Sequence, residues 1–178
     1  MFSFFFGDER YLPLTDKDSN FLMARNTLFG PLHIAGDHIF PVDTSLKPAE
    51  AAASYELKIR HHFHGECAFD LVLLGLGDNS HTASLFPHTT ILKEKKALVK
   101  EVFVKEVNMY RITFTAPLIN LAHSIAFLVF GSAKAVAVHH ILKDSSNIDE
   151  YPAQLISPDN GELHWFLDEA AAELIQEK

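Results

Sequence analysis

Apolar residues gather into short, nearly continuous runs along this chain, and three of the runs end directly at a glycine. These are residues 2–6 before Gly7, residues 69–74 before Gly75, and residues 125–130 before Gly131. Such a run is typical of a β-strand that is covered on both faces. Weaker strand patterns cover residues 97–105, 110–115 and 163–167.

Helical patterns lie between these strands, at residues 20–29, 48–63, 132–142 and 168–176. Ser19 is a suitable N-cap for the first of them, Gly30 a suitable end, and Pro48 fits the first turn of the second. Alternating strands and helices predict an α/β fold with a mostly parallel, doubly wound (Rossmann-like) sheet and helices on both faces. Since no repeat or linker interrupts the pattern, we expect residues 1–178 to form a single domain.

Composition narrows the functional classes. Apolar residues make up 48% and charged residues 21% of the 178 positions, which excludes intrinsic disorder. The formal net charge of −8 argues against nucleic-acid and anionic-membrane partners, because both need a basic surface. The single cysteine, Cys67, excludes a disulfide framework. We therefore expect a cytoplasmic protein.

Polar side chains follow each of the three glycines. They are Asp8, Glu9 and Arg10 in the first case, Asp78, Asn79, Ser80 and His81 in the second, and Lys134 in the third. In open α/β sheets, ligands bind at the carboxyl ends of the strands, where glycines let the backbone approach closely. We expect these side chains to converge on one site, whose cations, histidine and carboxylates suit a phosphorylated, oxygen-rich small molecule.

His81 is the candidate catalytic residue, because imidazole titrates near neutral pH and can act as a general base or acid. An isolated histidine more often packs or caps a turn. Here its place among glycines at the end of a strand favours catalysis. Ser80 is not expected to be a nucleophile activated by His81, because adjacent residues on a turn rarely face each other, and the Gly-x-Ser-x-Gly elbow is absent.

Residues 75–87, Gly-Leu-Gly-Asp-Asn-Ser-His-Thr-Ala-Ser-Leu-Phe-Pro, resemble the signature of the 6-phosphogluconolactonases. This family belongs to a larger group that includes glucosamine-6-phosphate deaminase. Further similar blocks follow the family's order: residues 6–13 with 18–20, residues 111–120 with 131–135, and residues 161–168. The resemblance implies hydrolysis of 6-phosphogluconolactone to 6-phosphogluconate, in the oxidative pentose phosphate pathway, without a metal or an organic cofactor.

The resemblance also implies roles for individual residues. His81 matches the histidine that is taken to activate water, and the expected catalytic group is His81, Asn79 and Asp8. The expected substrate-binding residues are Arg10, Lys134, Asn20, Gly75, Gly77 and Arg111. Of these, Arg111 begins a strand and would lie away from the site if that strand were parallel to its neighbours. Backbone N–H groups of residues 75–80 would stabilise the oxyanion.

Two features depart from the family's pattern. Asn79-Ser80 stands where the family usually has Asp-Gly, and Ser80 would be strained if the position needs a positive φ. Family members also carry some tens of residues before the Asp-Glu-Arg block, including a phosphate-wrapping Ser-Gly-Gly loop. We therefore expect an N-terminally truncated form that lacks a βα portion. The apolar run at residues 2–6 is typical of an interior strand with neighbours on both edges. Without the missing portion, one of these edges would be exposed, which would favour poor solubility or a homodimer.

Two alternative functions stay open: a sugar-phosphate isomerase or deaminase of the same superfamily, and a sugar-phosphate-binding remnant without catalysis. Leu85-Phe86 before Pro87 disfavours deamination, because deaminases of that kind have an Asn-Glu pair there. His61, His62 and His64, and likewise His139 and His140, lie near helix ends. We interpret them as helix-end residues rather than metal ligands.

Overall fold

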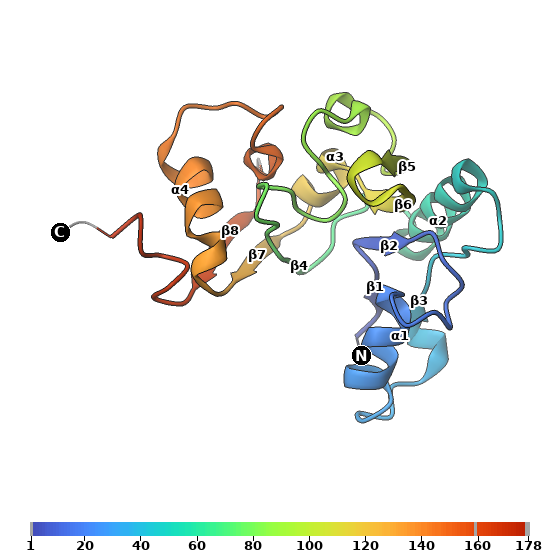
Figure 1. Ribbon diagram of the computed structural model, residues 1–178. Helices are drawn as coiled ribbons and strands as arrows, with labels where there is room; N and C mark the ends of the chain where they lie inside the picture. The colour runs from blue at the N-terminus through green and yellow to red at the C-terminus, as the bar shows by residue number, and fades with distance from the viewer. Residues whose placement is uncertain (1, 159, 177–178) are drawn as a thin grey trace.

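The computed structural model describes residues 2–158 and 160–176, and within them the strands form three small sheets (Figure 1). The strands are β1 (Phe4–Phe5), β2 (Asp8–Arg10), β3 (Ile39–Phe40), β4 (Val72–Leu74), β5 (Val99–Val104), β6 (Met109–Phe114), β7 (Ser124–Val129) and β8 (Glu162–Leu167). Their orders are β1-β3, β2-β6-β5 and β4-β7-β8.

Two of the sheets are parallel, as the alternation of strands and helices predicts. β4 pairs with β7 and β7 with β8, while β1 pairs with β3. β7 is the central strand of its sheet: Ile125 and Phe127 are fully buried, and the Phe127 ring stacks on Trp165 of β8 at 4.0 Å between centroids. These parallel pairs confirm the predicted α/β class.

The third sheet is antiparallel, which the sequence pattern does not indicate. β6 pairs in the antiparallel sense with β2 on one edge and with β5 on the other. The connection between β5 and β6 is a single 3₁₀ turn, η4 (Lys105–Val107), followed by Asn108 with φ of 47°. So short a connection can only return the chain antiparallel, because a parallel crossover needs a dozen or more residues.

The helices match most of the predictions. The α-helices are α1 (Asn20–Ala24), α2 (Pro48–Phe63), α3 (Ala116–Asn120) and α4 (Ala135–Lys143). Short 3₁₀ segments are η2 (Gly36–His38), η3 (Thr90–Lys93), η5 (Ser132–Lys134) and η6 (Pro152–Leu155), and η1 (Arg25–Phe29) is a π-helix. The predicted helix at residues 20–29 is thus α1 plus η1, with Ser19 as its N-cap and Gly30 at its end. None of the described helices has the length and apolar character to cross a membrane.

The predicted helix at residues 168–176 is wrong: this segment forms turns. Asp168 does cap a turn, since its carboxylate accepts a hydrogen bond from the Ala171 backbone N–H at 2.8 Å. The same carboxylate also accepts from the Gly131 N–H at 3.0 Å, which ties the start of the segment to the end of β7.

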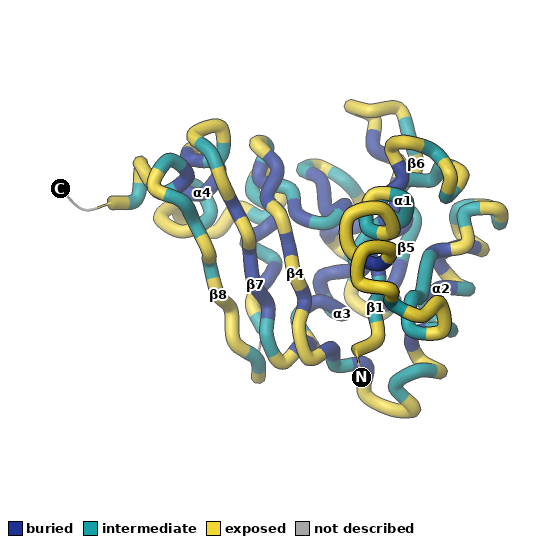
Figure 2. Tube along the Cα trace, turned by 90° about the horizontal axis from the view of Figure 1, so that it is seen from below, coloured by how far each residue is buried: buried dark blue, intermediate teal, exposed yellow. Residues whose placement is uncertain are grey.

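Within the described residues, the strand at residues 2–6 pairs on one edge only, with β3, so its other edge is left unpaired, as expected from the sequence for a chain without the preceding βα portion. In Figure 2, β8, β7 and β4 run side by side, and β4 is the strand of this sheet nearest to β1. Residues of β1 and β4 together line a groove of about 410 Å³. Phe2, Leu71 and Leu73 line this groove and are 82%, 53% and 61% exposed. The predicted exposed edge and exposed phenylalanine are therefore present.

Helix α2 fixes β1 relative to the rest of the molecule through Tyr55. The buried Tyr55 hydroxyl accepts a hydrogen bond from the Phe6 N–H at 2.7 Å and donates to the Phe40 carbonyl at 3.0 Å. Burial raises the pKa of Tyr55, so the hydroxyl keeps its proton. This contact joins β1, β3 and α2 just before Gly7, where the functional residues begin.

Candidate functional site

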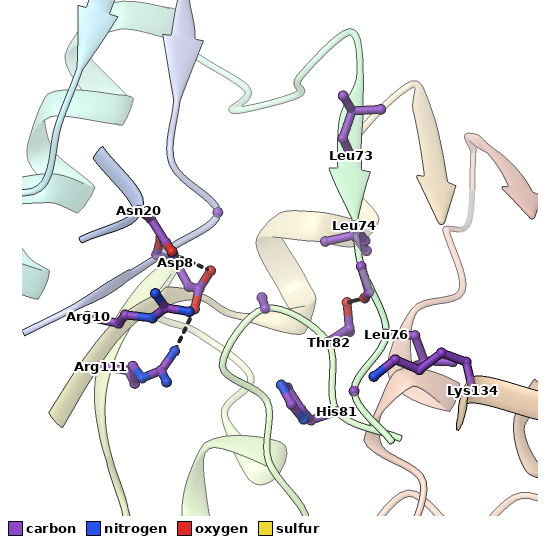
Figure 3. A pocket seen from close by; sticks show the side chains of 14 residues that line it. Asp8, Arg10, Asn20, Leu73, Leu74, Leu76, His81, Thr82, Arg111 and Lys134 are labelled. Atoms are coloured by element: carbon purple, nitrogen blue, oxygen red, sulfur yellow. Dashed lines mark hydrogen bonds and ion pairs between the residues drawn. The ribbon is translucent and has the colours of Figure 1, made fainter. Parts of the chain in front are cut away.

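A pocket of about 410 Å³ opens at the carboxyl ends of β1 and β4 (Figure 3). Its lining includes every predicted site residue except Asn79: Asp8, Arg10, Asn20, Gly75, Gly77, His81, Arg111 and Lys134. Residues far apart in the sequence therefore meet at one rim, as the three strand-ending glycines predict. Thr82 and Ala83 also line the pocket, and the sequence analysis did not single them out.

The loop after β4 is closed by its own hydrogen bonds. Thr82 Oγ1 donates to the Gly75 carbonyl at 2.9 Å, and the Gly77 N–H donates to the His81 carbonyl at 2.8 Å. A Cβ on Gly77 would overlap the His81 ring, so this glycine makes room for the imidazole. The family resemblance predicts that Gly77 binds substrate, and the structure shows that its lack of a side chain leaves space for the His81 ring.

Ser80 adopts a φ of 64°, within the left-handed region that favours glycine. Its side chain is buried, and its carbonyl accepts a hydrogen bond from the Ala153 N–H at 3.0 Å. The concern that Ser80 replaces a glycine at a positive-φ position is confirmed. Packing against η6 holds the serine in this conformation.

His81 is held from two sides. Its ring stacks on Phe86 with 4.0 Å between centroids, and its Nδ1 lies 2.5 Å from Asn79 Oδ1. The pKa of His81 is lowered to about 4, mainly because the ring is largely removed from solvent. Asp8 acts in the opposite direction, and Arg111 and Lys134 add to the lowering. The imidazole is therefore neutral near pH 7, which is the state that a general base needs.

Asp8 organises the opposite wall of the pocket. Its carboxylate accepts hydrogen bonds from Ser84 Oγ at 2.6 Å and Asn20 Nδ2 at 3.2 Å, and it forms an ion pair with Arg111 at 3.6 Å (Figure 3). Arg111 reaches the pocket because β6 runs antiparallel to β2, which places it directly opposite Arg10 in the register. A strand parallel to its neighbours would have carried Arg111 away from the site, but β6 is antiparallel, and Arg111 lines the pocket.

Glu9 does not join the site, although it lies between two residues that do. Successive side chains on a strand point to opposite faces, so Asp8 and Arg10 face the pocket and Glu9 faces the interior. The fully buried Glu9 carboxylate accepts hydrogen bonds from the N–H groups of Asn20 and Phe21, each at 2.8 Å, and from Ser19 Oγ at 3.1 Å. It stabilises the start of α1 and so positions Asn20.

Three cations and one carboxylate line the pocket, in a chain whose net charge is −8. Arg10 and Arg111 lie on one side of His81, and Lys134 lies on the other (Figure 3). Lys134 follows Gly131, whose φ of 91° lets the chain turn from β7 into η5. This local excess of positive charge fits an anionic ligand.

Some of the backbone N–H groups expected to stabilise an oxyanion already donate hydrogen bonds within their own loop. Those of Gly77 and Ser80 donate to carbonyls of the same loop, and that of Asn79 donates to Asp78 Oδ1 at 3.1 Å. These three amides therefore hold the loop, and the expectation fails for them. Cationic side chains at the rim are better placed to stabilise negative charge.

The histidine clusters lie outside the pocket. In the part of the chain that the structure describes, one group of three potential metal ligands lies together: His139, His140 and Asp144, at the end of α4. His140 forms an ion pair with Asp144 and stacks on Tyr151 with 4.5 Å between centroids. These contacts support the interpretation of His139 and His140 as residues that end a helix.

Comparison with known proteins gives a family match over most of the chain. The model of the family "Glucosamine-6-phosphate isomerases/6-phosphogluconolactonase" matches residues 1–165. A 6-phosphogluconolactonase from Synechocystis sp. is 42% identical over 174 residues, covering 95% of this chain and 71% of that protein. The Homo sapiens 6-phosphogluconolactonase is 36% identical over 173 residues, covering 96% of this chain and 67% of its own length.

Solved structures that are similar to this chain agree with the family match. The crystal structure of devB protein has a TM-score of 0.89 at 31% identity, covering 98% of this chain and 74% of that one. The 6-phosphogluconolactonase from Trypanosoma brucei has a TM-score of 0.82 at 32% identity, and the match covers 96% of this chain and 73% of that one. A monomeric glucosamine-6-phosphate deaminase, at 21% identity and a TM-score of 0.78, shares the fold.

Proposed function

Since this chain belongs to the glucosamine-6-phosphate isomerase/6-phosphogluconolactonase family, we propose that it hydrolyses 6-phosphogluconolactone to 6-phosphogluconate. The observation that carries the proposal is a neutral, partly buried histidine between cationic side chains at the rim of one pocket. Relatives from Synechocystis sp., Nostoc sp. and Homo sapiens, which are 42%, 45% and 36% identical to the chain, bear the name of this activity.

In the proposed mechanism, His81 acts as the general base. Its Nε2 takes a proton from a water molecule as the water oxygen attacks the lactone carbonyl carbon. The ester bond then breaks, and the imidazolium returns the proton to the departing ring oxygen. A δ-lactone is a reactive ester, so this route needs no covalent nucleophile. Proton transfer by a positioned side chain contributes about 10²–10⁴ in rate.

The cations divide the anionic parts of the substrate among them. We assign the phosphate to Arg10 and Lys134, and Arg111 to the negative charge that develops on the carbonyl oxygen. Asp8 holds Arg111 and Asn20 toward the pocket through the contacts described above. Binding energy from the phosphate, which does not react, then orients the lactone beside His81.

The experiment follows lactone disappearance by stopped flow, with freshly made 6-phosphogluconolactone, and subtracts spontaneous hydrolysis. Glucosamine 6-phosphate serves as the second substrate, with ammonia release as its signal. We expect acceleration of lactone hydrolysis and no ammonia. Ammonia release would favour the deaminase alternative. Binding of 6-phosphogluconate without acceleration would favour a non-catalytic remnant.

We also propose that the chain works in the cytoplasm, without nucleic-acid or membrane partners, and as a homodimer. The single cysteine, Cys67, supports the first statement, and the acidic net charge supports the second. The apolar groove between β1 and β4 supports the third, because exposed strand edges and apolar side chains favour association. Light scattering after gel filtration tests the dimer: a monomer at micromolar concentration would contradict it.

A further inference from the structure

The Asn79 side chain bridges His81 to a carboxylate that comes from a distant part of the chain. Asn79 Oδ1 lies 2.5 Å from His81 Nδ1 and accepts a hydrogen bond from the His81 backbone N–H at 3.3 Å. On its other side, Asn79 Nδ2 donates to Glu106 Oε2 at 3.3 Å. Glu106 belongs to η4, the turn between β5 and β6. Glu106, Asn79 and His81 therefore form a continuous chain of contacts.

These contacts with His81 and Glu106 fix which way the Asn79 amide faces. A backbone N–H only donates, so the atom nearest the His81 N–H must be the Asn79 oxygen. An ionised carboxylate only accepts, so the atom nearest Glu106 must be the Asn79 nitrogen. Both ends demand the same orientation of the amide.

The orientation of the amide determines the tautomer of His81. With Oδ1 facing the ring, Nδ1 must carry the proton, and Nε2 must carry the lone pair. A reversed amide would present N–H groups to Nδ1 and shift the proton to Nε2, which could then not accept a proton from water. An aspartate at this position has two equivalent oxygens and needs no such anchor. An asparagine does need one.

We propose that Glu106 is a positioning residue for the reaction: it anchors the Asn79 amide and thereby keeps His81 in the tautomer whose Nε2 accepts the proton. The inference rests on the proposed lactonase function for its kinetic part alone. Glu106 touches neither the pocket nor His81, so it acts through Asn79. Because Glu106 is exposed and water can replace part of its hydrogen bond, we expect a partial effect.

The test compares Glu106→Ala with Glu66→Ala, which removes an exposed carboxylate beyond the end of α2. We expect Glu106→Ala to lower kcat by about three- to tenfold, with KM changed less than twofold and Glu66→Ala without effect. The same substitution is then made in an Asn79→Asp background, where the anchor is unnecessary. There Glu106→Ala should not lower kcat, because it removes no needed anchor and only takes away a like charge beside the new carboxylate. An equal loss of kcat in both backgrounds would overturn the proposal.

A spectroscopic measurement tests the effect of Glu106 on the His81 tautomer without relying on turnover. The ¹⁵N chemical shifts of the His81 ring, recorded near pH 7, report which nitrogen carries the proton. We expect the Nδ1-protonated form in the unmodified protein and a mixture of tautomers in Glu106→Ala. Identical ring shifts in the two proteins would overturn the inference, even if the chain proved inactive on the lactone.

Discussion

Gly77 leaves room for the ring of His81, four residues further along the chain. A Cβ at Gly77 would overlap the Nδ1, Cε1 and Cγ atoms of that ring. The Gly77 N–H also donates to the His81 carbonyl at 2.8 Å, so the two residues are fixed to each other through the backbone. The position of the proposed base therefore depends on the absence of one methyl group.

Gly77→Ala should displace the imidazole and lower kcat by about 100-fold, since a displacement of about 1 Å costs that much in catalysis. KM should change less than kcat, because Arg10 and Lys134, to which we assign the phosphate, come from other segments of the chain. The matched control is Gly65→Ala, which lies outside the pocket and where a Cβ meets no heavy atom within 4 Å. Steady-state kinetics of both variants, with circular dichroism to check folding, measure the effect. Equal activity of the two variants would contradict this role of Gly77.

The pH dependence follows from the neutral state of His81. Its pKa lies at about 4, below the ordinary value of about 6.5, chiefly because the ring is buried. The charged groups facing it are Asp8 and Asp78, which raise the pKa, and Arg111 and Lys134, which lower it. We expect kcat/KM to be level from about pH 6 to 8 and to fall as the pH approaches 4. A fall centred near pH 6.5 would contradict the buried neutral imidazole.

The same pKa shift affects stability. Between pH 4 and 6.5 the unfolded chain binds more protons at His81 than the folded chain does, so the free energy of unfolding should rise with pH across this window. In His81→Asn this contribution is absent. Urea denaturation of both proteins at several pH values measures the difference, which should be constant above pH 6.5.

Substrate recognition should depend on both sides of the pocket. Arg10→Ala and Lys134→Ala should each weaken 6-phosphogluconate binding by about 1.5–3 kcal/mol, the range for hydrogen bonds to charged groups. Arg25→Ala removes an exposed positive charge outside the pocket and serves as the control. Isothermal titration calorimetry gives the three affinities. A loss that is equal in all three variants would mean that net charge, rather than contact, determines binding.

Ser80→Gly should stabilise the protein. Serine at a φ of 64° is strained by about 1–2 kcal/mol, and glycine relieves that strain. Glycine also makes the unfolded chain more flexible, which offsets up to about 1 kcal/mol, so we expect a net gain of about 0.5 kcal/mol. Ser145→Gly, at an exposed position without a positive φ, should instead lower stability. Urea denaturation midpoints compare them. Equal losses in both variants would contradict the strain at Ser80.

The sequence predicts where the candidate pocket lies, but not the antiparallel pairing of β2, β6 and β5. Three strand-ending glycines locate the rim, because the carboxyl ends of parallel strands meet at one edge. The orientation of β5 and β6 is not visible in their residues; it depends on the length of the turn between them. Arg111 could therefore be assigned to the pocket only once β6 was seen to run antiparallel to β2.

Glu9 and Glu106 show why single residues are harder to assign. Glu9 is adjacent to two pocket residues, and only the alternation within the short strand β2 reveals that it is buried and caps α1. Glu106 is far from the signature in sequence and meets Asn79 only through the tertiary fold. Long-range contacts of this kind leave no local pattern in a single sequence.

The most direct test of the account is the catalysed rate of His81→Asn on 6-phosphogluconolactone at pH 7, after subtraction of spontaneous hydrolysis. Asparagine keeps a polar side chain of similar size but cannot accept a proton from water at this pH. His61→Asn, at the exposed end of α2, is the control. We expect a loss of about 10²–10⁴ in kcat for His81→Asn, with 6-phosphogluconate affinity within about twofold of the unmodified protein. Full catalytic activity in His81→Asn would contradict the assignment of His81 as the general base.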